Sequence, residues 1–461
     1  MRGYLLISAP PVGALLSGWQ MEKLEKEFTD LVALNRWNEL VEWDRYYRGD
    51  FDRASLPSTN HSAVAKEYDD LLNRADLPIC SLVVSAVVER LKVEGFREGS
   101  DELTNSLLWE WFQKSKLDAR QQMLYSDAMV FGDGFLSVTP GGDVPIFRVE
   151  SPMNLSVEYN PQDPMLIKRA AKVVGDYGWL YTEDIIYSFK YSRETITGWT
   201  LTGALEHTGG STPIVRFPNR IDSRGRSMSE IQLVASIQRR IIQTTADRLL
   251  VQRAAAWKQR YVSGISVDTD ADGNAVAPWN IGVDQLIVSE DTDTKFGEFG
   301  ASSFREHLEA VDLDIRQAAA VTQTPPHLIA PSAISNISAE ALVALEAGLA
   351  SKVKDRQLTW GEAFEEALAI GGRMVGQEIS YDTETVWADL ESRSDAQRVD
   401  AALKLRSMGL PLPFLLERIG LSPQTSTRVM ASVREEQQLA ADISASSFGL
   451  GAGQGPLDES V

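Results

Sequence analysis

The apolar residues between Arg220 and Gly372 repeat at helical spacing in three long stretches. The first stretch predicts a helix from about Ser229 to Trp257. The second, with apolar residues four and three positions apart, predicts a helix from about Ser303 to Val321. The third predicts a helix from about Ser338 to Ile370, which at about 1.5 Å per residue would be roughly 50 Å long. A helix of that length usually spans a whole domain or crosses an assembly.

Local signals mark where these helices begin and end. Ser303 and Glu306 have the spacing of a capping box, which predicts the start of the second helix. Thr324-Pro325-Pro326 ends it, because proline lacks the amide hydrogen and restricts the residue before it. Gly371-Gly372 ends the third helix. The uncharged stretch from Gln317 to Ala339 is predicted to be a loop around the two prolines rather than a membrane span.

The N-terminal half changes period at about residue 135, from helical spacing to the alternation of strands. The predicted helices are Met21–Arg45, Ala63–Arg74, Ile79–Leu91, Asp101–Lys114 and Ala119–Phe131, with Val93–Phe96 as a short strand. The later predicted strands are Phe135–Val138, Pro145–Val149, Leu155–Tyr159, Leu166–Val174, Gly178–Thr182, Asp184–Tyr191 and Ile214–Phe217.

The C-terminal part returns to helices. After a strand at Glu384–Trp387, helices are predicted at Ser394–Ser407, Leu412–Ile419 and Gln424–Leu439. Ser444–Val461 is rich in Gly and Ser, which predicts a disordered tail. Gly3–Met21 carries no charge and is interrupted by Pro10-Pro11, which favours a loosely packed arm over a signal peptide. The whole pattern predicts an α+β protein.

Composition narrows the function. The 461 residues are 43% apolar, enough for two to four domains with real cores. The formal net charge is -20, which argues against a protein that reads nucleic-acid sequence through a basic face. It does not exclude a surface past which nucleic acid slides. The single cysteine, Cys80, excludes an internal disulfide and a cysteine-based zinc site.

Charge also changes sign along the first two long helices and their connection. Residues Arg239–Arg260 carry six Lys or Arg and only Asp247, whereas Tyr261–Gly300 carries eight Asp or Glu and only Lys295. These two stretches are either complementary contact faces or solvated surfaces, and the sequence favours neither. Strands are expected at Tyr261–Val267 and Asp284–Val288.

Candidate chemistry is sparse. The first half of an EF-hand calcium loop is matched by Asp268, Asp270, Asp272 and Gly273. Position twelve of that loop, however, is Trp279 rather than Glu. An acidic hairpin tip is the favoured interpretation, and a metal-dependent enzyme acting on nucleic acid is the alternative. The four histidines lack zinc-hydrolase spacing, and the P-loop, dinucleotide-binding and nucleophile-elbow motifs do not occur. We therefore expect no enzyme activity, no metal and no cofactor.

Several segments, in this order and spacing, resemble the portal proteins of long-tailed bacteriophages, especially those of actinobacterial phages. The similar segments are Val87–Phe96, Phe217–Arg220 with Ser229–Ile231, Gln259–Gly264, Thr322–Leu328 and Ser338–Leu342. The resemblance implies a portal fold with an α/β wing, a helical stem, a small clip, a long tunnel helix and a helical crown. The implied parts are an N-terminal arm (1–21), wing (22–226 with 373–392), stem (227–260 and 301–322), clip (261–300), tunnel loop (323–337), long helix (338–372), crown (393–441) and disordered tail (442–461).

The resemblance also implies partners and site residues. Portal proteins form a ring, typically of twelve subunits, at one capsid vertex, and this ring is a non-enzymatic channel for packaging and ejecting double-stranded DNA without sequence specificity. The implied partners are the major capsid protein, the terminase large subunit and a head-tail adaptor protein, in the virion and, during assembly, in the host cytoplasm. Another head-tail connector or adaptor protein is the alternative, although adaptors are usually much shorter.

Two groups of site residues follow from the resemblance. The tunnel-loop residues expected to face DNA are Ile334, Ser335, Asn336 and Ile337. The acidic clip residues expected to dock an adaptor are Asp268, Asp270, Asp272, Asp284, Glu290, Asp291 and Asp293. An acidic channel is physically sensible, because lysine and arginine that neutralise phosphates bind DNA tightly and would slow its passage. Ring closure further requires that each subunit use two different faces.

Overall fold

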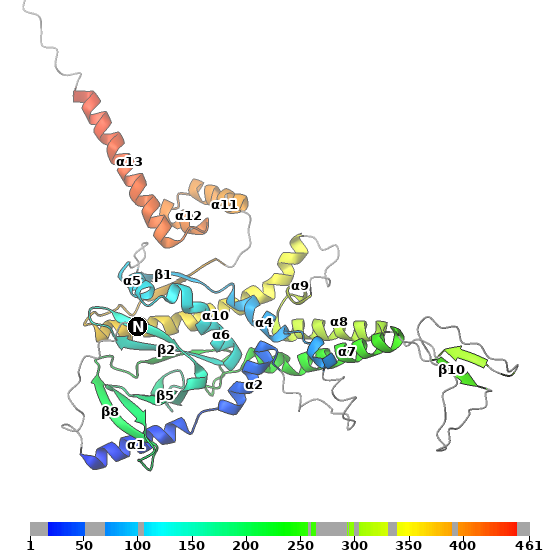
Figure 1. The fold of residues 1–461 in the computed structure, drawn as a ribbon. Helices are drawn as coiled ribbons and strands as arrows, with labels where there is room; N and C mark the ends of the chain where they lie inside the picture. The colour runs from blue at the N-terminus through cyan, green and yellow to red at the C-terminus, as the bar shows by residue number, and fades with distance from the viewer. Residues whose placement is uncertain are drawn as a thin grey trace, which may run out of the picture. The chain divides into compact units, whose positions relative to one another are not determined.

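The structure is a computed structural model, and it describes residues 17–50, 70–99, 106–256, 260–263, 293, 295–298, 304–330, 339–389 and 395–449. The chain forms two compact units, drawn in Figure 1. The first unit contains Met1–Asp50, Pro78–Ala235 and Ala319–Val461, and the second contains Phe51–Leu77 and Ser236–Ala318.

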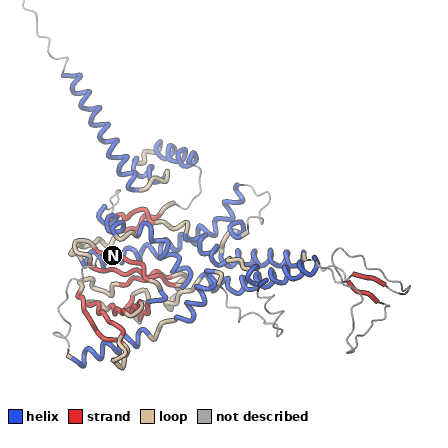
Figure 2. The backbone as a smooth tube through the Cα atoms, in the orientation of Figure 1, coloured by secondary structure: helices blue, strands red, loops and turns tan. Residues whose placement is uncertain are grey.

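Two antiparallel sheets form the centre of the first unit, and Figure 2 shows their strands. The three-stranded sheet has the order β3-β2-β9, and the five-stranded sheet is a meander of β4 to β8. Their bounds are β2 Asp133–Pro140, β3 Pro145–Glu150, β4 Leu155–Tyr159, β5 Ile167–Val174, β6 Tyr177–Tyr181, β7 Ile185–Tyr191, β8 Trp199–Glu206 and β9 Ile214–Pro218. A short 3-10 turn, Pro152–Asn154, connects the two sheets along the chain.

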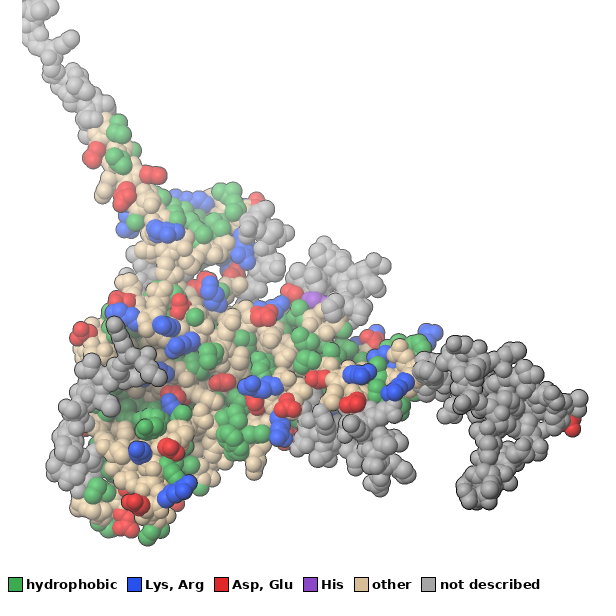
Figure 3. Space-filling view, viewed as in Figure 1, with side chains coloured by type: hydrophobic (Ala, Val, Ile, Leu, Met, Phe, Trp, Pro, Cys, Tyr) green, Lys and Arg blue, Asp and Glu red, His purple; other side chains and the backbone are tan. Residues whose placement is uncertain are grey.

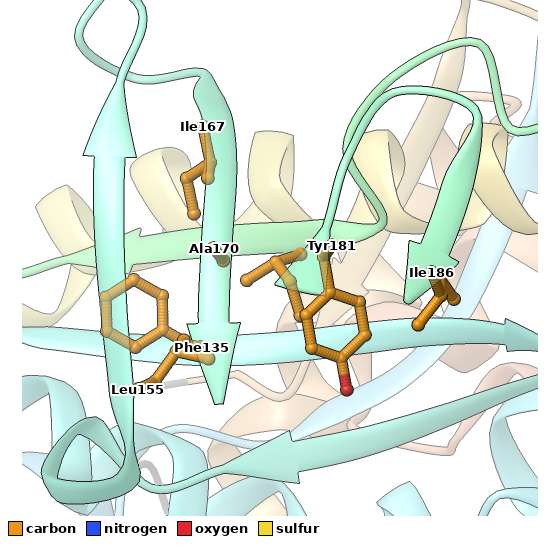
Figure 4. Close-up of a cluster of buried hydrophobic side chains, with 7 residues drawn as sticks. Phe135, Leu155, Ile167, Ala170, Tyr181 and Ile186 are labelled. Carbon is orange, nitrogen blue, oxygen red and sulfur yellow. The ribbon is translucent and has the colours of Figure 1, made fainter. Parts of the chain in front are cut away.

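Side-chain alternation along the strands produces a separate core on each face of the five-stranded sheet. Ala170 and Tyr181 belong to a cluster that includes Phe135 and Ile214 of the three-stranded sheet (Figure 4). Their neighbours Ala171 and Leu180 point the other way and pack with Phe28 and Leu31 of α1 (Gly18–Val32). Helix α1 thus covers one face, and the three-stranded sheet covers the other.

Helices pack on the three-stranded sheet through a cluster of aromatic rings. Tyr125 of α6 (Leu117–Phe131) stacks on Trp360 of α10 (Ala339–Met374), with ring centroids 5.2 Å apart. Phe364 of α10 lies edge-on to Phe217 of β9, with centroids 4.8 Å apart. Trp360 also donates its indole hydrogen to the Pro218 carbonyl at 2.8 Å. These contacts fix the 36-residue helix α10 against the sheet.

The remaining elements of the first unit are short strands and helices. Strand β1 pairs antiparallel with β12, although the two lie far apart in sequence. The bounds are α2 Trp37–Arg48, α4 Ile79–Val88, β1 Val93–Glu98, α5 Ser106–Lys114, α9 Pro326–Ile329, β12 Thr383–Trp387, α11 Asp395–Ser407, α12 Leu412–Arg418 and α13 Pro423–Gly449.

The second unit is mostly a pair of helices. Helix α7 (Glu230–Ala256) enters it from the first unit, and α8 (Arg305–Thr322) leaves it. Arg240 of α7 donates to Asp314 of α8 at 2.6 Å, and Ile242 and Ala246 pack with Leu72. Beyond the helices, β10 (Arg260–Ser263) pairs antiparallel with β11 (Lys295–Glu298).

Most predicted elements in the described residues are confirmed, with several corrections. Helix α10 continues through Gly371-Gly372, which were predicted to end it, and stops at Met374, before the left-handed Gly376. Strand β11 was not predicted, and the strand predicted at Asp284–Val288 lies outside the described residues. The helix predicted at 21–45 is two helices, because the chain turns at Ala33–Arg36, where Asn35 donates to the carbonyls of Met153 and Leu155 at 3.3 and 3.5 Å. Strand β8 was not predicted. Helix α13 continues to Gly449, so the disordered tail predicted from Ser444 is wrong up to that residue. Helix α1 begins at Gly18, inside the predicted arm.

Other predictions lie partly outside the described residues. Of the helix predicted at 63–74, residues 70–74 are described and helical. The predicted loop at 323–337 contains the short helix α9 before its described part ends at residue 330. Among described residues, Asp70–Val88 is the one segment with the length and apolar composition to cross a membrane, and 56% of it is buried, as in a core helix.

Candidate functional site

A buried charge cluster in the first unit joins the start of α7, the end of α8 and the middle of α10. We call it the Glu230 cluster; it consists of Asn219, Arg220, Glu230, Lys352 and Arg356. Glu230 is the first residue of α7, where a carboxylate is favoured by the helix dipole. Ser229 caps this helix: its hydroxyl accepts from the Ile231 amide at 3.0 Å and donates to the Val130 carbonyl.

Three cations share the Glu230 carboxylate. Arg220 Nε donates to Oε1 at 2.5 Å, Arg356 donates to the same oxygen at 3.0 Å, and Lys352 Nζ donates to Oε2 at 2.7 Å. Glu230 is fully buried, and the Lys352 side chain is equally inaccessible. Asn219 completes the network, because its Oδ1 accepts from Arg356 and its Nδ2 donates to the Met228 carbonyl at 2.6 Å.

The cluster shifts the pKa values of its members. Burial disfavours the Glu230 carboxylate, but Lys352 and Arg220 outweigh burial and lower the pKa of Glu230 below its ordinary 4.5. Burial lowers the pKa of Lys352 to about 8, although Glu230 opposes the fall. Burial likewise lowers the pKa of Arg356. The cluster therefore contains three cations and one carboxylate, so its positive charges outnumber its negative charge.

The cluster also fixes the end of α8. Lys352 Nζ donates to the carbonyl of Thr322, the last residue of α8, at 2.9 Å. The chain then turns through Gln323, whose φ of 54° is left-handed. The amide of Thr324 donates to Ala319 at 3.0 Å and that of Gln323 to Ala320 at 3.4 Å, which is the Schellman pattern of helix termination. The predicted tunnel loop therefore begins at a fixed point.

The sequence analysis cited Asn219, Arg220 and Glu230 only as parts of segments that resemble portal proteins, and it did not connect them with Lys352 or Arg356. A signal was present: Leu349, Val353 and Trp360 form the apolar face of α10, and Lys352 and Arg356 fall on that same face at helical spacing. Charged residues on an apolar face require buried partners, but the spacing within α10 does not say that the partner is Glu230, 122 residues earlier.

The predicted site residues lie mostly outside the described residues. This holds for Ile334, Ser335, Asn336 and Ile337, and for Asp268, Asp270, Asp272, Asp284, Glu290 and Asp291. Asp293 is described, and it is exposed in a turn just before β11. The pairing of β10 with β11 brings the two ends of the acidic segment together.

The described residues offer no metal-binding group, and the face drawn in Figure 3 has no basic patch. No group of three or more His, Cys, Asp or Glu residues that could hold a metal occurs among the described residues, although Asp268–Asp272 lie outside them. On the face drawn in Figure 3, the described Lys and Arg side chains are interspersed with Asp and Glu and form no broad basic surface.

Comparison with solved structures found chains from gene transfer agent particles, at TM-scores below 0.5. A chain from the neck of an empty GTA particle, computed with C6 symmetry, gives a TM-score of 0.45 at 15% identity, with 82% of this chain and 94% of that chain covered. A chain from the virion of a native gene transfer agent particle gives a TM-score of 0.40 at 13% identity, with coverage of 83% and 93%.

Comparison of sequences identifies the family. The portal protein of Mycobacterium phage L5 is 29% identical over 432 residues, which cover 84% of this chain and 82% of that protein. The portal protein of Mycobacterium phage D29 is 29% identical over 400 residues, which cover 78% of each. Residues 34–419 match the model of the family described as phage portal protein, SPP1 Gp6-like. Because this match spans most of its length, the chain belongs to that family of phage portal proteins.

Proposed function

We propose that this portal protein assembles into a ring of twelve subunits at one capsid vertex, and that the ring is the channel through which double-stranded DNA is packaged and ejected. Portal proteins are structural components of the virion and not enzymes, so no catalytic residue is assigned. The energy for packaging would come from a separate terminase.

The order of described elements is the observation that carries this proposal. Helix α7, the β10–β11 pair, helix α8, the short α9 and the 36-residue α10 follow one another along the chain. This order supports residues 227–260 and 301–322 as the stem, 261–300 as the clip and 338–372 as the long helix. The pairing of β12 with β1 supports the return of residues 373–392 to the wing (22–226). Helices α11 to α13 support a helical crown from residue 393.

The clip would carry the contacts with other virion proteins. The acidic residues of 261–300, from Asp268 to Asp293, give this segment a strongly negative charge, which suits docking of a head-tail adaptor with a basic surface. The terminase large subunit would dock at the same end before the adaptor, and the wing would contact the major capsid protein.

The channel wall would be formed by the long helix and the loop that precedes it. The tunnel-loop residues Ile334 to Ile337 carry no charge, so they would touch DNA without neutralising phosphates. A formal charge of -20 on each subunit, repeated around a ring, would surround DNA with a repulsive field and prevent it from sticking.

Electron microscopy of the purified full-length protein tests the ring. Class averages are expected to show rings with a central hole, and mass measurement in solution is expected to give twelve times the mass of one chain. A protein that stays monomeric at high concentration and at all salt concentrations would contradict the proposal. Rings of another closed number would contradict the stoichiometry alone.

A further inference from the structure

A cavity of about 710 Å³ lies in the first unit, and none of its lining residues belongs to the Glu230 cluster. It is bounded by the turn between α1 and α2, the loop between β4 and β5, and the loop after β9. Its volume lies within the range of about 300–1,000 Å³ that is usual for ligand pockets. The lining residues used below are Arg36, Asp133, Tyr159, Arg216, Arg224 and Arg226.

The floor of this cavity is a rigid hydrogen-bond network. Arg216, which is 2% exposed, donates to Asp133 Oδ1 at 2.8 Å and to the carbonyls of Pro164 and Gly225 at 2.8 and 3.0 Å. Its guanidinium lies 4.2 Å from the centroid of the Tyr159 ring. Asp133 Oδ2 accepts from Ser227 at 2.7 Å and Tyr159 at 3.3 Å. Every hydrogen-bonding group of this floor is engaged, so a ligand would be held by the rim.

The rim of the cavity carries three arginines, two of which are already paired with carboxylates. Arg36 is held by both oxygens of Glu39, at 2.9 and 2.7 Å, and Arg226 donates twice to Asp222 Oδ2, at 2.9 and 2.7 Å. Neither Glu39 nor Asp222 lines the cavity, whereas both guanidiniums do. Arg224 is exposed and makes no ion pair with any described residue. The lining thus contains four arginines and one carboxylate, in a chain whose net charge is -20.

We propose that this cavity binds an acidic peptide segment of a protein partner, with a carboxylate of the peptide paired to Arg224, the rim arginine that makes no ion pair with a described residue. Guanidinium groups bind carboxylates with two parallel hydrogen bonds, and Arg36 already does so with Glu39. A DNA duplex presents its phosphates on a convex surface and cannot enter a cavity bounded by three loops. A short extended peptide, by contrast, can reach the rim.

Fluorescence anisotropy of the full-length protein with a labelled, end-capped hexaglutamate peptide tests the proposal. Saturable binding is expected, and Arg224→Gln is expected to weaken it at least tenfold. The matched control is Arg193→Gln, in the turn after β7, because Arg193 is also exposed and makes no ion pair with a described residue. This control is expected to bind like the wild type. Both variants should unfold at the wild-type temperature, since neither side chain is buried.

Three outcomes would overturn the proposal. The first is the absence of saturable binding by the wild type. The second is an equal loss in Arg224→Gln and Arg193→Gln, which would show that net charge alone attracts the peptide. The third is competition by inorganic phosphate or by a single-stranded oligonucleotide as effective as that by unlabelled peptide, which would show a site for any anion. None of these outcomes depends on whether the protein forms a ring.

Discussion

At the scale of single residues, the most consequential group is the Glu230 carboxylate. Three cations converge on it from separate elements: Arg220 after β9, and Lys352 and Arg356 from α10. A buried ion network of this kind is weak evidence for high stability, because desolvation offsets much of its attraction. We expect it to contribute to specificity instead, since a misplaced helix would leave buried charges without partners.

Replacing Glu230 by Gln should therefore be severely destabilising. The variant keeps the shape of the side chain but leaves Lys352 and Arg356 buried without a counter-charge. We expect a loss of about 3–5 kcal/mol in the free energy of unfolding, measured by urea denaturation of the monomer. The exposed residue Glu183 supplies the control, and Glu183→Gln should change the free energy by no more than about 0.5 kcal/mol. A similarly small change in Glu230→Gln would mean that the cluster contributes little to keeping α7, α8 and α10 together.

His207 gives stability a dependence on pH. Its Nδ1 accepts from the Gly209 amide at 3.2 Å, and its Nε2 lies 3.1 Å from the Thr182 carbonyl, so the ring is neutral. Burial lowers its pKa below the ordinary 6.5. The unfolded chain therefore protonates His207 more readily than the folded chain does. The stability that neutral His207 contributes is complete above pH 6.5 and is lost as the pH falls through the lower pKa of His207 in the folded protein.

Urea midpoints at pH 7.5 and pH 5.0 measure this effect. The wild type should lose more stability between the two values than His207→Gln, whose amide does not titrate. Equal losses in the two proteins would assign the acid sensitivity to other groups.

At the scale of elements, glycines within α10 have opposite surroundings. Gly348 is exposed, and a Cβ atom there would meet nothing within 4 Å. A Cβ at Gly371 would lie 2.9 Å from the Cβ of Pro145 and 3.1 Å from the ring of Phe147. Only the second position needs glycine for packing against the three-stranded sheet.

Alanine substitution should separate the two positions. Gly348→Ala is expected to stabilise the protein by about 1 kcal/mol, because alanine favours the helix. Gly371→Ala is expected to destabilise it by about 1–3 kcal/mol through overpacking. Thermal denaturation of both variants provides the comparison, and a gain in Gly371→Ala would contradict the close contact with β3.

The end of α8 allows a second test within one helix. Gln323 occupies a left-handed conformation that costs a side chain energy, so Gln323→Gly should stabilise the protein by about 1 kcal/mol. Ala320→Gly, three residues earlier and equally exposed, should destabilise it by about 1 kcal/mol. If both changes lowered the melting temperature, the Schellman turn would not form as described.

How far the sequence predicts these elements depends on how local their causes are. Strong apolar periodicity was sufficient for α7, α8 and α10, and Pro325-Pro326 marked the end of α8, whereas Gly371-Gly372 lie inside α10 and did not end it. Strand β8 was missed because glycine interrupts its alternation, and it is specified by pairing with β7. The break between α1 and α2 was missed because it depends on Asn35 reaching carbonyls more than a hundred residues away. The Glu230 cluster was missed for the same reason.

At the scale of the whole molecule, membership of the portal family decides among the functions left open by composition. The match over residues 34–419 excludes the alternatives of a short head-tail adaptor and of a metal-dependent enzyme. The basic part of α7 is also less available than the sequence suggested, since Arg240 is already paired with Asp314 of α8 in the same chain.

The assignment of residues 323–337 as the tunnel loop can be tested on assembled rings. The double substitution Ile334→Lys with Ile337→Lys should convert a weakly interacting loop into one that binds phosphates. Duplex DNA should then bind the rings, with a slope of log affinity against log salt of about -0.9 for each phosphate neutralised. Replacement of both residues by Gln is the control and should leave binding negligible. DNA binding unchanged by the lysines would place this loop away from the channel.

Lys352 grips the final carbonyl of α8 and the first side chain of α7 at once. A force on the chain beyond Gln323 would therefore act first on the buried hydrogen bonds of Lys352, and not on the apolar core. If residues 323–337 form the tunnel loop, as we propose, this anchor would keep the pressure of passing DNA on that loop from displacing α8 and α10.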